Sequence, residues 1–190
     1  PVHALREFDK PLILGCLGNI RPAKNYPLAI EFVQLLKSKG ISVRLRIAGD
    51  DTKSGAIELK KDVARLGLED NVEFLGFIDD VPGFFGSIDV FLMTSSSEGH
   101  PLALTQALAA AKPILSTRNG VEHVVPEHLL FLAKEHTAES LFTALEVLLQ
   151  STESKEGSER LVEGRKFVKD NYSEDVMRQR YTNLYEIGAA

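Results

Sequence analysis

Residues 12–38 have the sequence LILGCLGNIRPAKNYPLAIEFVQLLKS. The stretch starts with a short, continuous apolar run, passes through a turn around Gly18, and ends in a longer segment whose apolar residues have helical spacing. A buried strand, a turn and an amphipathic helix in this order form the repeating unit of α/β proteins. The stretch therefore predicts a parallel strand at Leu12–Leu17 and a helix at Tyr26–Ser38, with Asn25 as the residue that caps this helix.

The same unit recurs along the chain. The apolar runs that we predict as buried parallel strands are Leu12–Leu17, Val43–Ala48, Val72–Phe74, Asp89–Met93, Pro113–Leu115 and Leu129–Leu132. The segments with helical spacing are Tyr26–Ser38, Gly55–Leu66, Asp80–Gly86, Pro101–Ala111 and Ala138–Leu149. This alternation predicts the α/β class, in the form of a Rossmann-like three-layer domain with a parallel sheet of about six strands and helices on both faces.

The carboxyl-terminal part of the chain departs from this alternation. Two helical segments, Glu156–Asn171 and Ser173–Ile187, follow the last predicted strand. We predict a loose linker at Gln150–Ser158, because this segment contains three Ser, one Thr and charges of both signs. We assign residues 1–172 to one domain and residues 173–190 to a final helix, whose apolar face covers this domain or docks on a neighbour.

Composition restricts the class of protein. The chain has 190 residues, of which 44% are hydrophobic and 26% charged, and no apolar run approaches the length of a membrane helix. Its net charge of -5 argues against general nucleic-acid binding, which needs a positive field. Cys16 is the only cysteine, which favours a reducing, cytoplasmic compartment. The sequence starts at Pro1 without an initiator Met or a signal region, and we expect it to be cut from a longer protein.

The loop after the first predicted strand is the first candidate site, because ligands of α/β sheets bind at the carboxyl ends of the strands. Two glycines precede Arg21 and Lys24, which lie three residues apart at the start of a helix. Glycine permits close approach of the backbone to a ligand, and the two cations suit phosphate oxygens. The alternative is a tight turn with solvated cations. The loop is neither a Rossmann nor a Walker fingerprint.

The loop and helix after the fourth predicted strand form the second candidate site. Pro101 suits the first turn of a helix, so the free N–H groups of Gly99–Leu102 should point into the cleft and attract an anion. Glu98 offers a carboxylate to sugar hydroxyls, and Gln106, about one and a half turns into the helix, can face the same cleft. The alternative for Glu98 is a carboxylate that caps the helix or complements its dipole.

Two further loops contribute candidates. Phe77 and Ile78 follow the third predicted strand and either border a flat base or belong to the core. Asn119 and Gly120 would face the sugar side of the cleft, although Asn-Gly is also a common turn pair. The remaining histidines, which lack the spacing of metal ligands and which we expect on the surface or in loops, are His3, His100, His128 and His136.

Taken together, these loops resemble the carboxyl-terminal, donor-binding domain of the retaining GT-B glycosyltransferases (glycosyl transferases group 1), which include glycogen synthases, sucrose synthases and bacterial mannosyltransferases. The similar motifs are Gly-x-x-x-x-x-Lys-Asn at Gly18–Asn25, Phe-Leu-Gly at Phe74–Gly76 and Ser-x-x-Glu-Gly-x-Pro-Leu at Ser95–Leu102. The ending Tyr172–Tyr185 is similar to the helix that crosses back toward the amino-terminal domain in this family. The resemblance extends in order from about Leu12 to the end of the chain.

The resemblance implies that residues 1–172 bind a nucleotide-diphosphate sugar, with UDP or GDP as the nucleotide, and that neither a metal nor a cofactor is required. By this resemblance Arg21 and Lys24 hold the diphosphate and stabilise its departure, and Glu98 contacts the sugar; these three are the catalytic candidates. The donor-binding candidates are Gly18, Asn19, Phe77, Ile78, Gly99, His100, Pro101, Leu102, Thr105, Gln106, Asn119 and Gly120.

Three positions depart from the family pattern. Gln106 replaces the Glu that holds the ribose, and Asn119 replaces the first Gly of a Gly-Gly pair. His123 stands where a Glu is common, with Glu122 one step early. These differences bear on the donor sugar rather than on the fold, and they leave a divergent member with little activity as an alternative.

The resulting prediction is a retaining hexosyltransferase that moves a sugar from a nucleotide diphosphate to a hydroxyl acceptor in polysaccharide, glycolipid or lipopolysaccharide synthesis. The acceptor should bind to a missing amino-terminal domain, so this chain alone should be inactive. We predict no nucleic-acid partner, no transmembrane segment, and a cytoplasmic location that is compatible with peripheral association at the inner face of the membrane. The alternatives are a non-catalytic nucleotide-sugar-binding module, a sugar-nucleotide epimerase and, least favoured, a flavodoxin-like receiver domain.

Overall fold

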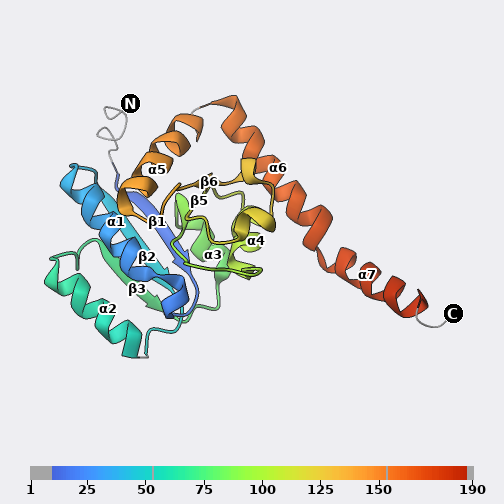
Figure 1. The fold of residues 1–190 in the computed structure, drawn as a ribbon, viewed down its shortest axis with the longest axis horizontal. Coiled ribbons are helices and arrows are strands. Elements are labelled where there is room, and N and C mark those ends of the chain that lie inside the picture. Colours follow the sequence, from blue (N-terminus) through green and yellow to red (C-terminus); the bar gives the residue numbers. More distant parts are fainter. Residues whose placement is uncertain (1–9, 53, 153, 188–190) are drawn as a thin grey trace.

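The sheet at the centre of the molecule has the predicted parallel architecture. The structure, a computed structural model, describes residues 10–52, 54–152 and 154–187 (Figure 1). Within them, six strands form one parallel sheet in the order β3-β2-β1-β4-β5-β6. The strands are β1 (Leu12–Leu17), β2 (Val43–Ala48), β3 (Val72–Gly76), β4 (Val90–Met93), β5 (Ile114–Ser116) and β6 (Phe131–Leu132). The prediction of a Rossmann-like α/β fold is confirmed.

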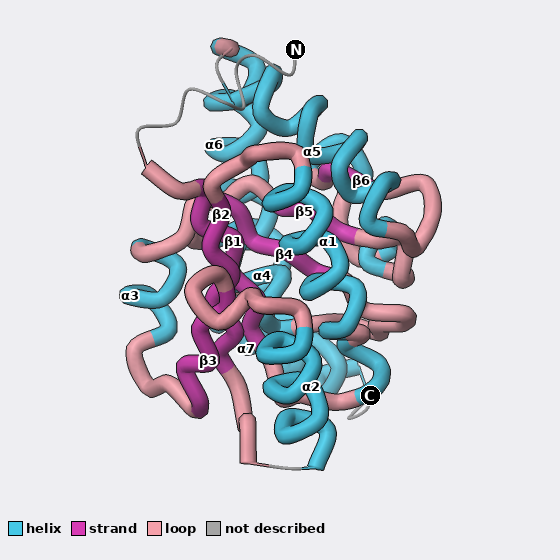
Figure 2. Tube along the Cα trace, turned by 90° about the vertical axis from the view of Figure 1, so that its left-hand side faces the viewer, coloured by secondary structure: helices cyan, strands magenta, loops and turns pink. Residues whose placement is uncertain are grey.

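Helices cover both faces of the sheet. In Figure 2, α3 lies on one side of the strands, and α1 and α2 lie on the other. The helices that share the α1 face are α1 (Tyr26–Ser38), α2 (Ser54–Arg65) and α5 (Ala138–Thr152), and those of the opposite face are α3 (Val81–Gly86) and α4 (Leu102–Ala109). Each face therefore has its own hydrophobic core.

Strand β1 shows why its sequence is a continuous apolar run. Leu12, Leu14 and Cys16 are buried in the core beneath α1, α2 and α5. The alternate residues Ile13 and Leu17 pack against the core beneath α3 and α4. Because successive side chains of a strand point to opposite faces, a strand that is covered on both sides must be apolar at every position.

The last helix of the chain extends away from the body of the molecule (Figure 1). Helix α6 (Lys155–Tyr172) packs against α4 and α5, and helix α7 (Glu174–Ile187) packs mainly against α6. Ser173, between the two helices, is extended. The large apolar side chains that α7 exposes are Met177, Tyr181, Leu184 and Tyr185. No helix in the described ranges has both the length and the apolar character that a membrane span requires.

The predicted linker at Gln150–Ser158 is wrong. Helix α5 continues to Thr152, and α6 starts at Lys155. Ser154 caps α6, because its hydroxyl oxygen accepts a hydrogen bond from the N–H of Gly157 at 3.1 Å. The serines that indicated a loose segment therefore include a helix-capping residue.

Other boundaries differ in smaller ways. Asn25 is the N-cap of α1, as predicted, but it has left-handed backbone angles (φ 47°, ψ 46°) and its side chain makes no capping hydrogen bond. The predicted strand Leu129–Leu132 is reduced to β6, because Glu127–Leu129 form a 3-10 turn, η4. Pro101 is the N-cap of α4 instead of its first helical residue.

Candidate functional site

A pocket lies where the strand order of the sheet reverses. Strands β1 and β4 are neighbours, but the chain continues from β1 toward β2 and from β4 toward β5. The carboxyl ends of strands at such a switch point form the usual ligand crevice of open α/β sheets. The pocket here has a volume of about 360 Å³, within the range of small-molecule sites.

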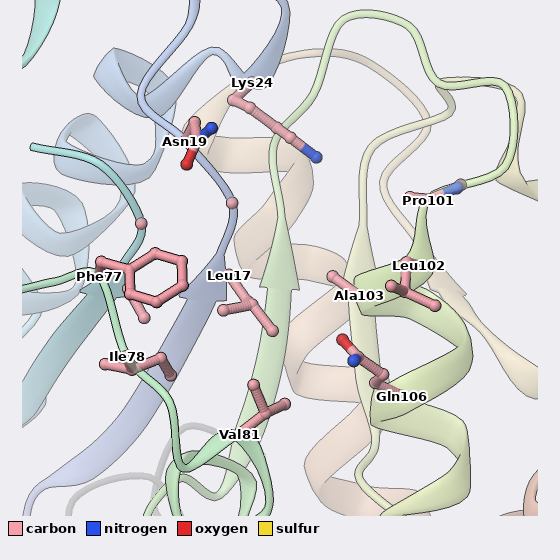
Figure 3. A pocket seen from close by; sticks show the side chains of 13 residues that line it. Leu17, Asn19, Lys24, Phe77, Ile78, Val81, Pro101, Leu102, Ala103 and Gln106 are labelled. Carbon is pink, nitrogen blue, oxygen red and sulfur yellow. The ribbon is translucent and has the colours of Figure 1, made fainter. Parts of the chain in front are cut away.

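Eight of the residues predicted from the sequence line this pocket. They are Gly18, Asn19, Lys24, Phe77, Ile78, Pro101, Leu102 and Gln106. Figure 3 shows Phe77 and Ile78 on one side, the residues of α4 on the other, and Leu17 between them at the end of β1. Phe77 is 79% exposed, so it is not a core residue, and its ring borders the pocket.

The backbone of Gly18 forms part of the pocket wall and is held from two sides. A Cβ atom at Gly49 would lie 2.2 Å from the carbonyl oxygen of Gly18, so only glycine fits at position 49, where φ is 152°. The same carbonyl oxygen accepts a hydrogen bond from the hydroxyl of Tyr26 at 2.7 Å. Burial raises the pKa of Tyr26, which keeps its hydroxyl protonated as a donor.

Lys24 links the loop after β1 to the loop after β4. Its Nζ donates to Oε1 of Glu98 at 2.8 Å, and the hydroxyl of Ser95 donates to the same oxygen at 2.6 Å. The backbone carbonyl of Lys24 accepts a hydrogen bond from the hydroxyl of Thr94 at 3.0 Å. The side chains of Lys24 and Glu98 are 24% and 13% exposed. The cation of the pocket is therefore fixed in position and paired with a half-buried carboxylate.

Helix α4 presents its first turn to the pocket. Pro101, Leu102 and Ala103 all line it. The unpaired N–H groups at a helix start carry a partial positive charge and favour an anion. The side chain of Gln106 points into the same space from the next turn (Figure 3), where its amide can both donate and accept hydrogen bonds.

The structure does not bring Arg21 into this pocket. Arg21 is exposed and lines a separate hollow of about 180 Å³ beside α2, together with Glu58 and Asp62. It precedes the 3-10 turn Pro22–Lys24 (η2) in an extended conformation (φ -134°, ψ 154°). The spacing of three residues suggested that the two cations lie side by side, but Arg21 and Lys24 line different hollows.

Asn119 and Gly120 shape a loop beside the site. Asn119 is 5% exposed; its amide nitrogen donates to the hydroxyl of Ser116 at 3.2 Å, and its Oδ1 accepts from the N–H of Val121 at 3.2 Å. The carbonyl of Asn119 accepts the N–H of Glu98 at 2.7 Å. Asn119 and Gly120 therefore contact the backbone of Glu98, and they do not line the pocket themselves.

The candidates His100 and Thr105 line a second hollow, of about 410 Å³, between α4 and α7. Leu102 lines this hollow as well as the first pocket. The ring of His100 packs on that of Tyr172 at a centroid distance of 4.7 Å, and the buried Thr105 hydroxyl donates to the carbonyl of Leu102 at 2.8 Å. Gly99 is exposed.

The other histidines are dispersed. His128 contacts Glu163 at 2.9 Å, His136 contacts the carbonyl of Arg118 at 2.7 Å, and His3 lies outside the described residues. In the part of the chain that the structure describes, no group of three or more His, Cys, Asp or Glu side chains is arranged to hold a metal ion. Burial raises the pKa of the only cysteine, Cys16, to about 12.

Sequence reasoning missed part of the site. The lining residues outside the prediction are Leu17, Ala48, Gly49, Val81 and Ala103. Gly49 follows β2 directly, as Gly18 follows β1, and the same rule about strand ends could have found it. The hydrogen bonds of Tyr26 to the Gly18 carbonyl and of Ser95 to Glu98 depend on side-chain orientations that the spacing of residue types does not specify.

Comparison with known proteins identifies a family. The model of the family "Glycosyl transferases group 1" matches residues 3–164. The chain is 31% identical over 113 residues to the putative glycosyltransferase EpsF of Bacillus subtilis, covering 60% of this chain and 29% of EpsF. It is 28% identical over 188 residues to the putative colanic acid biosynthesis glycosyltransferase WcaL of Escherichia coli, covering 93% of this chain and 45% of WcaL.

Solved structures share the fold. HepE of Anabaena, determined in complex with UDP and glucose, superposes with a TM-score of 0.82 at 19% identity. The match covers 97% of this chain and 51% of HepE. The chain therefore spans about half, or less, of the length of the proteins it resembles.

Proposed function

The chain belongs to the glycosyl transferases group 1 family, and on this premise we propose that it is the donor-binding half of a retaining glycosyltransferase. The enzyme would move a hexosyl group from a UDP- or GDP-sugar to a hydroxyl acceptor in polysaccharide, glycolipid or lipopolysaccharide synthesis. We also propose that the reaction needs no metal and takes place in the cytoplasm, at or near the inner face of the membrane. The description of EpsF and WcaL as putative glycosyltransferases, the latter in colanic acid biosynthesis, and the UDP and glucose bound to HepE support this assignment.

The observation that carries the proposal is the convergence of Lys24 and the first turn of α4 on one pocket with an apolar wall. An ammonium group and free helix N–H groups are both suited to a diphosphate. As the bond to the sugar breaks, negative charge grows on the leaving diphosphate. Lys24 and the start of α4 would stabilise that charge electrostatically.

The other walls suit the remaining parts of a nucleotide sugar. The exposed ring of Phe77 and the side chain of Ile78 offer an apolar surface to a base. Gln106 offers its amide to the ribose, and Glu98 offers its second carboxylate oxygen to sugar hydroxyls. Among the described residues the guanidinium of Arg21 has no hydrogen-bond or ion-pair partner, so this side chain can turn toward a diphosphate that Lys24 already holds.

The acceptor would bind outside this chain. We propose that a preceding domain supplies the acceptor site and that α7 crosses back to pack on it. The exposed side chains of Met177, Tyr181, Leu184 and Tyr185 support this role, because a row of large apolar side chains on one helix normally has a partner. The 190 residues alone would then bind donor and transfer nothing at a useful rate.

A titration tests the proposal. We expect UDP or GDP, and the matching sugar nucleotide, to raise the melting temperature of this chain and to give a measurable Kd by calorimetry, since a ligand that binds only the folded state stabilises it. The absence of binding for every uridine and guanosine ligand at about 1 mM would contradict it. Retention is checked separately, by NMR of the anomeric configuration of the product from a longer protein that contains the preceding domain.

The second candidate is a non-catalytic nucleotide-sugar-binding module, which Gln106 favours because its amide lacks the charge of a carboxylate. The two candidates give different results in the longer protein. An enzyme transfers sugar with Gln106 in place. A module stays inactive both before and after the Gln106→Glu substitution.

A further inference from the structure

The ion pair of Lys24 and Glu98 stands at the border of the pocket. Lys24 lines the pocket, whereas Glu98 does not line it and is joined to it through Lys24. Glu98 is held in place by the hydroxyl of Ser95 at 2.6 Å, by the ammonium of Lys24 at 2.8 Å, and by its own N–H, which donates to Asn119 at 2.7 Å. The carboxylate thus has two partners, Ser95 and Lys24, and the backbone of the same residue is anchored at Asn119, so the carboxylate stays beside Lys24 when an anion arrives.

The geometry of an ammonium group fixes how close an anion comes to this carboxylate. The three N–H bonds of Lys24 are arranged tetrahedrally, and one of them is directed at Glu98. A phosphate oxygen on another N–H bond would lie roughly 4.5 Å from the Glu98 oxygen. At that separation two negative charges in a half-buried site repel each other appreciably.

The donor and the nucleoside diphosphate product of the proposed reaction differ in the charge of the terminal phosphate. Transfer breaks the bond between the anomeric carbon and the terminal phosphate oxygen and forms a bond from that carbon to the acceptor oxygen. The diphosphate keeps the electron pair, and the proton of the acceptor hydroxyl passes to the solvent. The terminal phosphate thereby gains an ionisable oxygen with a pKa of about 6, which is charged at neutral pH and above.

We propose that Glu98 makes the pocket discriminate against the nucleoside diphosphate product in favour of the nucleotide diphosphate sugar, and so promotes product release. The inference rests on the proposed function and deepens it. Glu98 repels the additional charge of the product, while the sugar of the donor covers the same oxygen and leaves it uncharged. Lys24 still attracts both ligands through the phosphate charges they share.

Three ligands separate this charge effect from contacts with the sugar. The probes are UDP, its β-methyl ester and UDP-glucose, or the corresponding guanosine set if the chain binds that base. The methyl ester has the charge of the donor but no sugar. Calorimetry at pH 8 on the Glu98→Gln variant should give a UDP affinity on the order of tenfold higher than that of the original chain. The affinities for the ester and for UDP-glucose should rise by a clearly smaller factor, or fall.

Two control variants isolate the charge of Glu98. Glu98→Asp keeps the negative charge, and its ratio of UDP to ester affinity should stay close to that of the original chain. Glu73→Gln makes the same change in net charge at the Arg46–Glu73 ion pair (2.9 Å), which does not line the pocket, and should leave all three affinities unchanged. The original chain itself, independently of any variant, should bind the ester at least as tightly as UDP.

Each other outcome has a defined meaning. Equal gains for UDP and the ester in Glu98→Gln would overturn the inference, because Glu98 would then only compete for Lys24. A Glu98→Asp variant that behaves like Glu98→Gln, or an original chain that binds the ester several-fold more weakly than UDP, would also overturn it. If the original chain binds neither nucleotide set, the proposed function fails. If the original chain binds these ligands but Glu98→Gln leaves the ratio of UDP affinity to ester affinity unchanged, this inference alone fails.

Discussion

The pocket and helix α7 differ in how their side chains are held. At the pocket, Lys24 and Glu98 are half-buried and hydrogen-bonded, and the Gly18 backbone is in contact with Gly49. On α7, Tyr181 and Leu184 are 57% and 67% exposed, and the helix packs mainly against α6. The comparison shows that the candidate pocket is built from loops held together within this fold, whereas α7 leaves large apolar side chains exposed.

The largest expected effect comes from breaking the wall of the pocket. Gly49→Ala places a Cβ atom 2.2 Å from the carbonyl oxygen of Gly18 and at a φ of 152° that favours glycine. We expect the free energy of unfolding to fall by about 3 kcal/mol or more, measured by urea denaturation. Gly67→Ala is the matched control, because its φ is also positive (63°) but its Cβ would have open space. Equal losses for both variants would contradict the importance of the Gly18 contact.

The second effect concerns the charge in the pocket. Lys24→Met removes the ammonium but keeps an unbranched chain, and we expect the affinity for the nucleoside diphosphate to fall about tenfold or more, by calorimetry. Lys37→Met is the control, since Lys37 lies on α1 outside the pocket and donates to the carbonyl of Gly67. If the two variants bind alike, Lys24 is not the anion-binding group.

The smallest expected effect is that of a substitution on the exposed face of α7. Leu184→Ala should change the free energy of unfolding of this chain by less than about 0.5 kcal/mol, because the side chain is 67% exposed. The same change at the fully buried Leu145 of α5 should cost about 2–5 kcal/mol. A loss of more than about 1.5 kcal/mol for Leu184→Ala would show that α7 has its partner within this chain.

The central elements of the fold could be predicted from the sequence, because they depend on patterns that are local. Leu12–Leu17, Val43–Ala48 and Tyr26–Ser38 have the predicted bounds. These segments combine an uninterrupted apolar run or a helical apolar stripe with clear turn residues at their ends. Gln150–Ser158 was predicted wrongly because serine is typical both of flexible loops and of helix caps.

The candidate site could be predicted only in part, for a different reason. Lys24 and Gln106 line the pocket as expected, because Lys24 lies in the loop between β1 and α1 and Gln106 lies in the second turn of α4, both at the carboxyl edge of the sheet. The placement of Arg21 in another hollow and the burial of Asn119 against the Ser116 hydroxyl depend on how the loops fold. Neither is encoded in the spacing of residue types along the chain.

The contact between Gly18 and Gly49 also has a consequence for altering the ligand preference of this domain. With backbone atoms touching on one side and the Tyr26 hydroxyl attached to the same carbonyl, that half of the pocket has no room to adjust. On the opposite side Leu102 lines the pocket and is 68% exposed, and an exposed side chain tolerates substitution. Directed evolution toward a larger or smaller ligand should therefore start from a library at Leu102 and leave the two glycines untouched.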